Sequence, residues 1–400
     1  MNNMVFKSND ILLKADFVVR YDYKVLFTDY VFNSQNTLLT ETLTSENQKP
    51  RCIVFVDEGL LEGNPNLPKS IINYFDKNTP LEDSLVCQPV VLEGGEKIKN
   101  SEEVLQEVLK TINDNNLCRQ SFTIAVGGGA FLDAIGLAST LAHRGVKHIR
   151  IPTTVLSQND SGVGVKNGIN KFSKKNFLGT FCPPYAVIND TQFLTSLSDR
   201  LWVSGCSEAV KVSLLKDETF FNFLSKHANE IKDRDMDLMK KLVVKCAELH
   251  LKHITQSADA FENSNSRPLD FGHWAAHKIE QMSNYEINHG EAVAIGLALD
   301  STYSFKNGFL AEEDLDKILT CLKSLGFEII WDDYYKYISS NSEPELFKGL
   351  DEFREHIGGE LSIPLLKGVA NPIEVSHIDK KVLLESIHYL MEREAQPSQV

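Results

Sequence analysis

The chain has 400 residues, of which 42% are hydrophobic and 24% are charged; this is long enough for two folded domains and excludes a disordered composition. The formal net charge of −14 argues against a nucleic-acid or anionic-membrane binder, because such proteins need a basic surface. A phosphorylated substrate stays compatible with this charge, since its site needs only a local cluster of Lys and Arg.

The cysteines and the N-terminus indicate the compartment. The seven cysteines are odd in number and form no C-x-x-C pair, so we expect reduced thiols rather than disulfides or a thiolate zinc site. The first 16 residues carry charged side chains, among them Lys7, Asp10 and Lys14, and no long apolar run, which argues against a signal peptide. No stretch approaches the roughly 18 apolar residues of a membrane span. These features predict a cytoplasmic protein.

In chain order, the first half alternates β-rich runs with helical patterns. Runs of β-branched, aromatic and apolar residues predict strands at 17–21, 51–57, 121–126 and 149–151. Apolar residues recur at helical spacing over 101–117, with Ser101 as the candidate cap, and another helix begins near Phe131. Strands that alternate with helices predict a parallel sheet with nucleotide-binding geometry.

From about residue 197 onward, long helical patterns dominate. They cover 207–224, 236–254, 272–282, 292–305 and 312–325, and the polar stretch 258–266 predicts a loop. We therefore predict an α/β N-terminal domain over residues 1–195, with a parallel dinucleotide-binding sheet. A mostly α-helical C-terminal domain, which binds metal and substrate, is predicted over residues 196–400.

Two glycine-rich turns suit a dinucleotide. Gly127–Gly129 stand between a predicted strand and a helix, where the backbone can approach a pyrophosphate. The run is not the G-x-G-x-x-G fingerprint, so an ordinary tight turn is an equal alternative. Asp57, at the end of an earlier strand, could accept a ribose hydroxyl or simply cap a helix. Glu96 and Lys99 could reach ribose and phosphate together, or could belong to a solvated charged turn.

One Glu and a group of His residues suit a divalent metal. Glu208, His289 and one of His273 and His277 would leave open positions for a substrate, as catalytic metal sites do. His273 and His277 are four residues apart and share a helix face, so spacing alone does not tell which of them binds the metal. Each His alone is more often a structural residue, and the clustering beside glycines favours the metal site.

Eight short motifs follow one another over most of the chain. They are GGEKIK (94–99), VGGGAFLD (126–133), HRGV (143–146), IPTTVLSQNDSGVGVK (151–166), KNFLGTF (175–181), SEAVK (207–211), DFGHWAAH (270–277) and NHGEAV (288–293). In this order they resemble the dehydroquinate synthase superfamily of sugar-phosphate cyclases.

The resemblance implies a role for each matching residue. The metal ligands would be Glu208, His273 and His289, with zinc or cobalt as the ion. NAD⁺ would contact Asp57, Glu96, Lys99, Gly128, Gly129, Asp133, Thr153, Thr154 and Lys175. Phosphate and hydroxyl contacts would come from Arg144, Asp160, Lys166, Asn176, Lys211, Lys252 and His277. The position of Arg144 reaches the neighbouring subunit's site in this family, which implies a homodimer.

The resemblance also implies the reaction. A sugar phosphate is converted to a carbocycle by transient oxidation with NAD⁺, elimination of phosphate and intramolecular aldol closure, which makes the enzyme a lyase.

Three positions bear on the substrate. Dehydroquinate synthases carry an Arg seven residues before the first metal His, where this chain has Ser266, and an Asn three residues before it, where this chain has Asp270. An acid there would repel a substrate carboxylate. The pattern with Arg267 and Asp270, and the segment 353–361, look like the sedoheptulose 7-phosphate cyclases, which make valiolone-type products. We therefore expect sedoheptulose 7-phosphate as the substrate.

Other functions stay open. His277 is more like dehydroquinate synthase or the less common 2-epi-valiolone branch, and Lys252 stands where dehydroquinate synthases place a substrate lysine. Dehydroquinate synthase is the main alternative. An NAD-dependent polyol dehydrogenase of the same fold would lack the phosphate-binding set of Arg144, Lys166, Asn176 and Lys211. A catalytically inactive binding protein would be expected to lose a metal ligand or Lys211, and none is missing.

Overall fold

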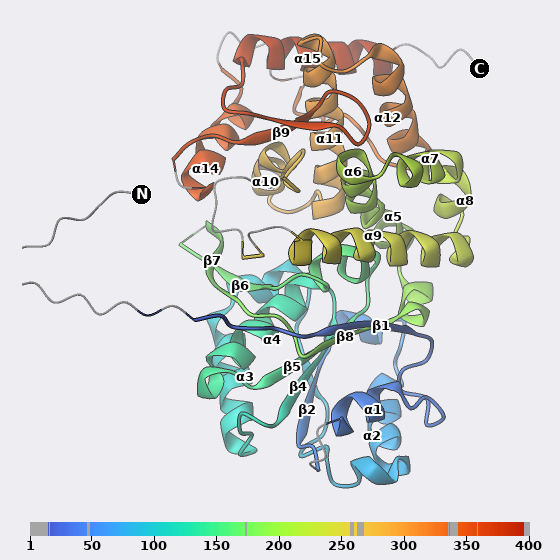
Figure 1. Ribbon diagram of the computed structural model, residues 1–400, viewed down its shortest axis with the longest axis vertical. Helices are drawn as coiled ribbons and strands as arrows, with labels where there is room; N and C mark the ends of the chain where they lie inside the picture. The colour runs from blue at the N-terminus through green and yellow to red at the C-terminus, as the bar shows by residue number, and fades with distance from the viewer. Residues whose placement is uncertain are drawn as a thin grey trace, which may run out of the picture.

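The computed structural model describes residues 15, 17–45, 49–172, 174–256, 260–261, 268–334, 336, 343–357 and 359–395. Its N-terminal half is a sheet flanked by helices, and its C-terminal half is a layer of helices stacked on the sheet's end (Figure 1). This is the predicted fold class, an α/β half with a parallel sheet followed by a helical half.

The main sheet has six parallel strands in the order β1-β8-β5-β4-β2-β3. They are β1 Lys24–Thr28, β2 Cys52–Asp57, β3 Val90–Leu92, β4 Phe122–Gly127, β5 Lys147–Pro152 and β8 Ala186–Asp190. The strand predicted at 17–21 is wrong, because these residues form no strand and the first strand begins at Lys24.

Alternate residues of β2 enter two different cores, as expected for a central strand covered on both faces. Cys52, Val54 and Val56 pack with α1 (Leu38–Thr44) and α2 (Leu67–Lys77). Ile53 and Phe55 pack with α3 (Glu102–Asp114) and α4 (Gly129–Leu141). Ser101 caps α3 through its side chain, as predicted.

Short single turns and a hairpin connect these elements. The turns are η1 Glu58–Leu61, η2 Thr79–Leu81, η3 Glu96–Asn100, η4 Ala142–Arg144, the π-helix η5 Ser157–Ser161 and η6 Thr191–Ser196. The antiparallel strands β6 (Lys166–Lys171) and β7 (Lys174–Phe181) form a hairpin between β5 and β8 that rises from the sheet towards the helical layer (Figure 1).

The last sheet strand ends at Asp190, and the helical layer begins with α5. Its elements are α5 Asp199–Ser204, α6 Cys206–Lys216, α7 Glu218–Lys226, α8 Ala228–Lys232, α9 Met236–Gln256, α10 His273–Met282, α11 His289–Lys306, α12 Glu312–Ser324, η7 Glu345–Phe347, α14 Lys348–Ile357, β9 Ile363–Leu366, β10 Pro372–Val375 and α15 Lys380–Ala395. The division into two units at residue 195 stays a prediction.

Two helix boundaries differ from the predicted ones for local reasons. The helix expected over 207–224 is two helices, because Asp217 is extended and its side chain caps α7. The helix expected from 292 begins at His289, because Asn288 and Glu291 form a capping box. The predicted loop 258–266 lies almost entirely outside the described residues.

All seven cysteines are free thiols, as expected. No helix among the described residues has the length and apolar character needed to cross a membrane.

Candidate active site

Three side chains from three helices converge on one point. Glu208 lies on α6, and His273 and His289 are the first residues of α10 and α11. The Nε2 atoms of His273 and His289 lie 3.5 and 3.4 Å from Glu208 Oε1. Ligand atoms that bind one tetrahedral zinc ion at about 2.1 Å stand ~3.4 Å apart. The three residues are therefore spaced as metal ligands.

Glu208 is buried in a way that suits a cation. Its side chain is 1% exposed, and among the described residues neither carboxylate oxygen has a partner in a hydrogen bond of normal geometry. The Lys211 ammonium lies 2.5 Å from Oε2. Burial opposes ionisation, but Lys211 and the two imidazoles hold the pKa of Glu208 well below its ordinary value. Glu208 is therefore an ionised carboxylate that could bind a cation.

The outer ring nitrogens of the two histidines are also engaged. His273 Nδ1 lies 3.1 Å from Phe271 O, and His289 Nδ1 lies 3.3 Å from Glu280 Oε2. A carbonyl or carboxylate at Nδ1 fixes the ring so that Nε2 faces the metal. Glu280 is not among the predicted site residues, although its spacing in the sequence is a signal. It follows His273 by seven residues, which is two helical turns on the same face.

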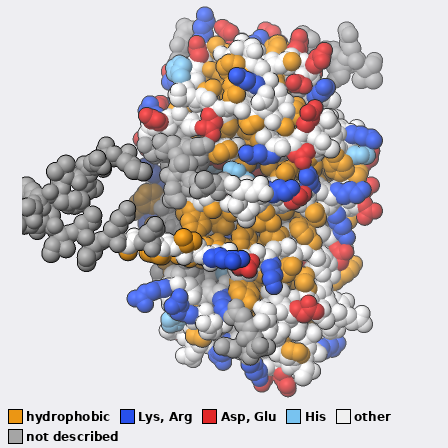
Figure 2. All heavy atoms as spheres, in the orientation of Figure 1, with side chains coloured by type: hydrophobic (Ala, Val, Ile, Leu, Met, Phe, Trp, Pro, Cys, Tyr) orange, Lys and Arg blue, Asp and Glu red, His pale blue; other side chains and the backbone are white. Residues whose placement is uncertain are grey.

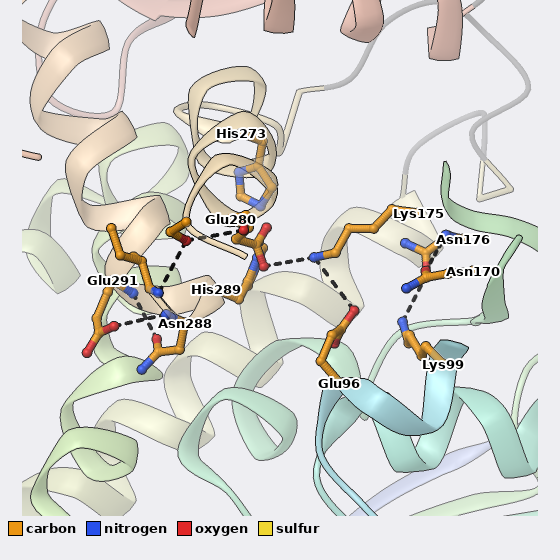
Figure 3. Close-up of polar contacts among 12 residues, drawn as sticks. Glu96, Lys99, Asn170, Lys175, Asn176, His273, Glu280, Asn288, His289 and Glu291 are labelled. Atoms are coloured by element: carbon orange, nitrogen blue, oxygen red, sulfur yellow. Dashed lines mark hydrogen bonds and ion pairs between the residues drawn. The ribbon is translucent and has the colours of Figure 1, made fainter. Parts of the chain in front are cut away.

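Glu280 continues the network to the other half of the molecule. Its Oε1 accepts a hydrogen bond from Lys175 Nζ at 2.8 Å, and Lys175 lies 3.8 Å from Glu96 (Figure 3). Lys175 belongs to β7 and Glu96 to η3. Although burial disfavours its charge, Glu280 and Glu96 raise the pKa of Lys175. The candidate metal ligand His289 is therefore connected to two elements of the N-terminal half.

A second group of charges surrounds Lys211. Glu208, Asp160 and Asp270 all raise the pKa of its buried ammonium, against the effect of desolvation. The Asp160 carboxylate is 2.6 Å from His250 Nδ1, on α9. Three carboxylates thus stabilise the charged form of one lysine, next to the candidate metal ligands.

On α9 it is His250, and not the predicted Lys252, that contacts Asp160. Lys252 pairs instead with Glu248 at 2.6 Å, and its side chain is 49% exposed. The structure therefore does not bring Lys252 into the site. Helical spacing explains the difference, because side chains two positions apart face different directions. Nothing in the sequence marked His250, since the packing of α9 against η5 is a tertiary contact.

The glycine-rich turns lie against Asp57. A Cβ on Gly94 would stand 1.9 Å from the Asp57 carboxylate, and one on Gly127 would stand 2.9 Å from its Cβ, so both positions require glycine. Gly128 precedes α4, which lacks a side-chain cap, so its first N–H groups are open to an anion. Asp57 itself caps η1 by accepting from Gly59 N at 2.9 Å, which is the alternative that the sequence left open.

Other predicted cofactor residues lie around this turn. Thr153 N donates to Gly127 O at 3.1 Å, and Thr154 lies beside Gly128. Gly129 packs against Ser161. These contacts bring the 151–166 motif to the glycine turn.

Lys99 joins three of the predicted residues. Its ammonium lies 2.6 Å from Asp133 Oδ2 and 2.9 Å from Asn176 Oδ1, and its side chain is 8% exposed. These residues come from η3, α4 and β7. The resemblance implied NAD⁺ contacts for Lys99 and Asp133 and a substrate contact for Asn176, and here the three form one cluster. Figure 3 shows the contact between Lys99 and Asn176.

The remaining predicted residues fall in different places. His277 lies within the histidine cluster, its ring centroid 5.5 Å from that of His273. Lys166 is exposed at the start of β6. Arg144 follows the far end of α4, a helix that is roughly 20 Å long, so it lies away from its own site. Arg267 lies outside the described residues.

Comparison with known proteins identifies the family of the chain. Residues 89–204 match the family model for the 3-dehydroquinate synthase N-terminal region, and 205–342 match that for its C-terminal region. The 3-dehydroquinate synthase of Dictyoglomus turgidum is 34% identical over 305 residues, which cover 76% of this chain and 82% of that protein.

Solved structures share the fold. The 2-epi-5-epi-valiolone synthase of Streptomyces hygroscopicus subsp. jinggangensis 5008, solved with NAD⁺ and Zn²⁺ bound, has a TM-score of 0.84 and 24% identity, and the match covers 95% of this chain and all (100%) of that one. A 2-deoxy-scyllo-inosose synthase, complexed with carbaglucose-6-phosphate, NAD⁺ and Co²⁺, has a TM-score of 0.70 and 22% identity, covering 91% and 96%. By its family models and its curated relatives, the chain belongs to the 3-dehydroquinate synthase superfamily of sugar-phosphate cyclases, which are lyase-type enzymes.

Proposed function

We propose that the chain cyclises a ketose phosphate without a carboxylate, of the sedoheptulose 7-phosphate type. The observation that carries this proposal is the group of Asp160, Glu208 and Asp270 around Lys211. Three acids near one cation leave little positive charge for a substrate carboxylate, and a like charge there would be repelled. The hydroxyl groups of a polyol can instead donate hydrogen bonds to these carboxylates.

The residues fit a metal and a dinucleotide. Glu208, His273 and His289 would hold zinc or cobalt, and the convergence of a buried carboxylate and two imidazoles supports this. The glycine turn beside Asp57, with Lys99 and Asp133, would hold NAD⁺. When bound, the cation would polarise a substrate hydroxyl and the cofactor would accept and return a hydride.

The chain's own groups would hold the substrate. Lys211 supplies a buried positive charge beside the metal ligands, and Asp160 accepts a hydrogen bond or takes a proton with His250 as its partner. Lys166 and Asn176 lie on the two strands of the hairpin and would contact the phosphate. Charge-assisted contacts of this kind favour the departing phosphate.

The alternative function is that of 3-dehydroquinate synthase itself. It is favoured by the curated relatives, which carry that name and reach 34% identity. Asp270 is the residue that argues against it, since its carboxylate acts on Lys211.

Phosphate release tests the proposal. The enzyme would be assayed with NAD⁺ and Zn²⁺ or Co²⁺ on sedoheptulose 7-phosphate and on the seven-carbon acid phosphate that dehydroquinate synthase uses. We expect turnover of the first alone. Turnover of the second alone would overturn the assignment based on Asp270. An Asp270→Asn variant, which removes one of the three acids, should gain activity on the acid substrate relative to the polyol.

We also propose that the enzyme is a homodimer. Large apolar side chains are exposed on the stretch before β1 and on the hairpin, with Phe17 82%, Val18 93% and Phe172 73% exposed. Tyr21 and Phe181 both contact the ring of Phe261, so the two segments adjoin. Hydrophobic side chains also gather across the middle of the face that carries β1 (Figure 2). A patch of this kind suits a second copy of the chain.

A further inference from the structure

Strand β5 carries a buried cation that the site described above does not include. The Arg150 side chain is 0% exposed, and no carboxylate of the described residues lies within ion-pair distance of its guanidinium. A buried charge is unfavourable unless polar groups surround it. Its partners are therefore informative.

The hydrogen-bond acceptors of Arg150 belong to one loop, residues 161–166, and to Asn167, which follows it. The terminal nitrogens of Arg150 donate to Ser161 O (3.4 Å), Gly162 O (3.1 Å), Gly164 O (2.8 Å), Lys166 O (2.8 Å) and Asn167 Oδ1 (2.7 Å). The loop thus wraps around the guanidinium with its carbonyl groups pointing inward.

The two other carbonyls of the loop are also held. Val163 O accepts from the Tyr23 hydroxyl at 3.1 Å, and Val165 O accepts from Cys182 N at 2.8 Å. All six carbonyls from 161 to 166 are therefore engaged. Tyr23 precedes β1 and Cys182 follows β7, so three separate segments fix this loop.

The loop joins two residues that the proposed function uses. It follows directly from the π-helix that carries Asp160, and it ends at Lys166, the first residue of β6. Asp160 in turn contacts His250 on α9. Arg150 thus bonds the carbonyls of the segment that connects these two side chains.

We propose that Arg150 is a positioning residue for the substrate, which acts through the loop 161–166 on Asp160 and Lys166. This inference rests on the proposed function in one respect, namely that a sugar phosphate binds beside Asp160 and Lys166. A guanidinium suits the task because its planar fork reaches acceptors on both sides of the loop, whereas the compact ammonium of lysine cannot span them.

The first test measures the loop without any substrate. Hydrogen exchange of the peptide covering 157–167 would be compared in wild type, Arg150→Lys and Tyr23→Phe, all as full chains with metal and NAD⁺. We expect at least about tenfold faster exchange in Arg150→Lys and a smaller increase in Tyr23→Phe, with peptides of α11 unchanged. Unchanged exchange of the 157–167 peptide in Arg150→Lys would overturn the proposal.

The second test measures kinetics with whichever of the two heptose phosphates the wild type turns over, so a wrong substrate assignment leaves it intact. A displaced reacting group costs about 100-fold in rate, so kcat/KM of Arg150→Lys should fall by roughly that factor while NAD⁺ affinity and metal content stay unchanged. Tyr23→Phe is a mild change that should leave the protein folded, and its kcat/KM should fall by a smaller factor.

His148→Gln is the matched control. His148 is buried on β5 two residues before Arg150 and on the same face, but its Nδ1 contacts Thr123 and not the loop. It should lose stability without a change in kcat/KM. Two outcomes would show a general structural role and overturn the proposal. One is a loss of kcat/KM in His148→Gln equal to that in Arg150→Lys. The other is a loss of NAD⁺ affinity and metal content in Arg150→Lys as large as its loss of kcat/KM.

Discussion

Glu280 shows how one residue gives a metal ligand its orientation and its charge environment. It is 3% exposed, and its two oxygens contact His289 and Lys175. Burial opposes its ionisation, but His289 and Lys175 hold the pKa of Glu280 far below its ordinary value. A permanent anion at Nδ1 makes the imidazole of His289 a better ligand.

Glu280→Gln should therefore weaken metal binding by about 10- to 100-fold, because the amide keeps the shape but loses the charge. Competition with a chromogenic chelator would measure this. The control is Glu352→Gln on α14. It removes the ion-pair partner of Lys278, which lies on the same helix as Glu280, and the Glu352 side chain is 48% exposed. Equal metal affinity in both variants would contradict the role of Glu280.

His250 and Lys252 form a second comparison at this scale. His250 contacts Asp160, and Lys252 faces solvent with Glu248. We expect His250→Ala to lower kcat/KM by about 100-fold, in the range of a lost acid–base or positioning partner, and Lys252→Ala to change it by less than about threefold. Steady-state kinetics on one substrate checks both. The reverse order of effects would restore Lys252 to the site.

At the scale of elements, the contact between α10 and α11 places two of the candidate metal ligands, His273 and His289, side by side. A Cβ on Gly296 of α11 would lie 2.1 Å from Gly272 O, so the two helices meet backbone to backbone. Asp300 of α11 accepts from Gly272 N and Trp274 Nε1, both at 2.9 Å. These bonds hold the start of α10, and with it His273, against α11.

Asp300 makes this contact sensitive to pH. Burial raises its pKa from 3.8 to about 7, although both hydrogen bonds lower it. The folded state then binds the proton more tightly than the unfolded state, so the contribution of Asp300 to stability is full below about pH 4 and is lost as the pH rises to about 7. The loss would be up to roughly 4 kcal/mol.

We expect Asp300→Asn to remove this part of the pH dependence. Urea unfolding of wild type and variant at several pH values between 4 and 8 would measure it. The difference between their free energies of unfolding should change by a few kcal/mol across this range and stay constant above it. Parallel curves throughout would show that Asp300 does not titrate in the folded protein.

At the scale of the whole molecule, the position of Arg144 matters most. It lies beyond the far end of α4, in a loop where His143, Arg144 and Gly145 all have positive φ. Strained exposed backbone of this kind often marks a functional contact. The remoteness of Arg144 from its own site supports the proposal that it serves the site of a second subunit.

Mixing two inactive variants tests this. Arg144→Ala and Glu208→Ala should each be inactive as homodimers. After subunit exchange at equal ratio, half of the dimers have one intact site, so about a quarter of wild-type activity should return. The control is Glu208→Ala mixed with His289→Ala. Each of these chains lacks a residue of its own metal site, so no mixed dimer has an intact site and no activity should return. Recovery in neither mixture would contradict the contribution in trans.

The sequence predicted the fold class because its signals are local. Apolar runs, the Ser101 cap and the glycine turn each determine nearby backbone. The stretch 17–21 was misread because β-branched and aromatic residues also suit an exposed apolar surface. The break at Asp217 depends on a single cap within a continuous helical pattern.

The candidate site was predictable to the extent that motifs carry it. Glu208, His273 and His289 converge as the resemblance implied. His250 and Arg150 were not predicted, because their roles come from packing between segments far apart in the chain. No local pattern reports that α9 faces Asp160, or that β5 lies beneath the loop 161–166.

The Lys175–Glu280 ion pair has a consequence for the rate of metal loss. A rotation that separates the hairpin from α10 must break this buried pair, and it frees the carboxylate that orients His289. If the site holds its proposed ion, release of that ion would accompany opening of the molecule. The rate of demetallation should level off at high chelator concentration, and its plateau would report the opening rate of the molecule itself.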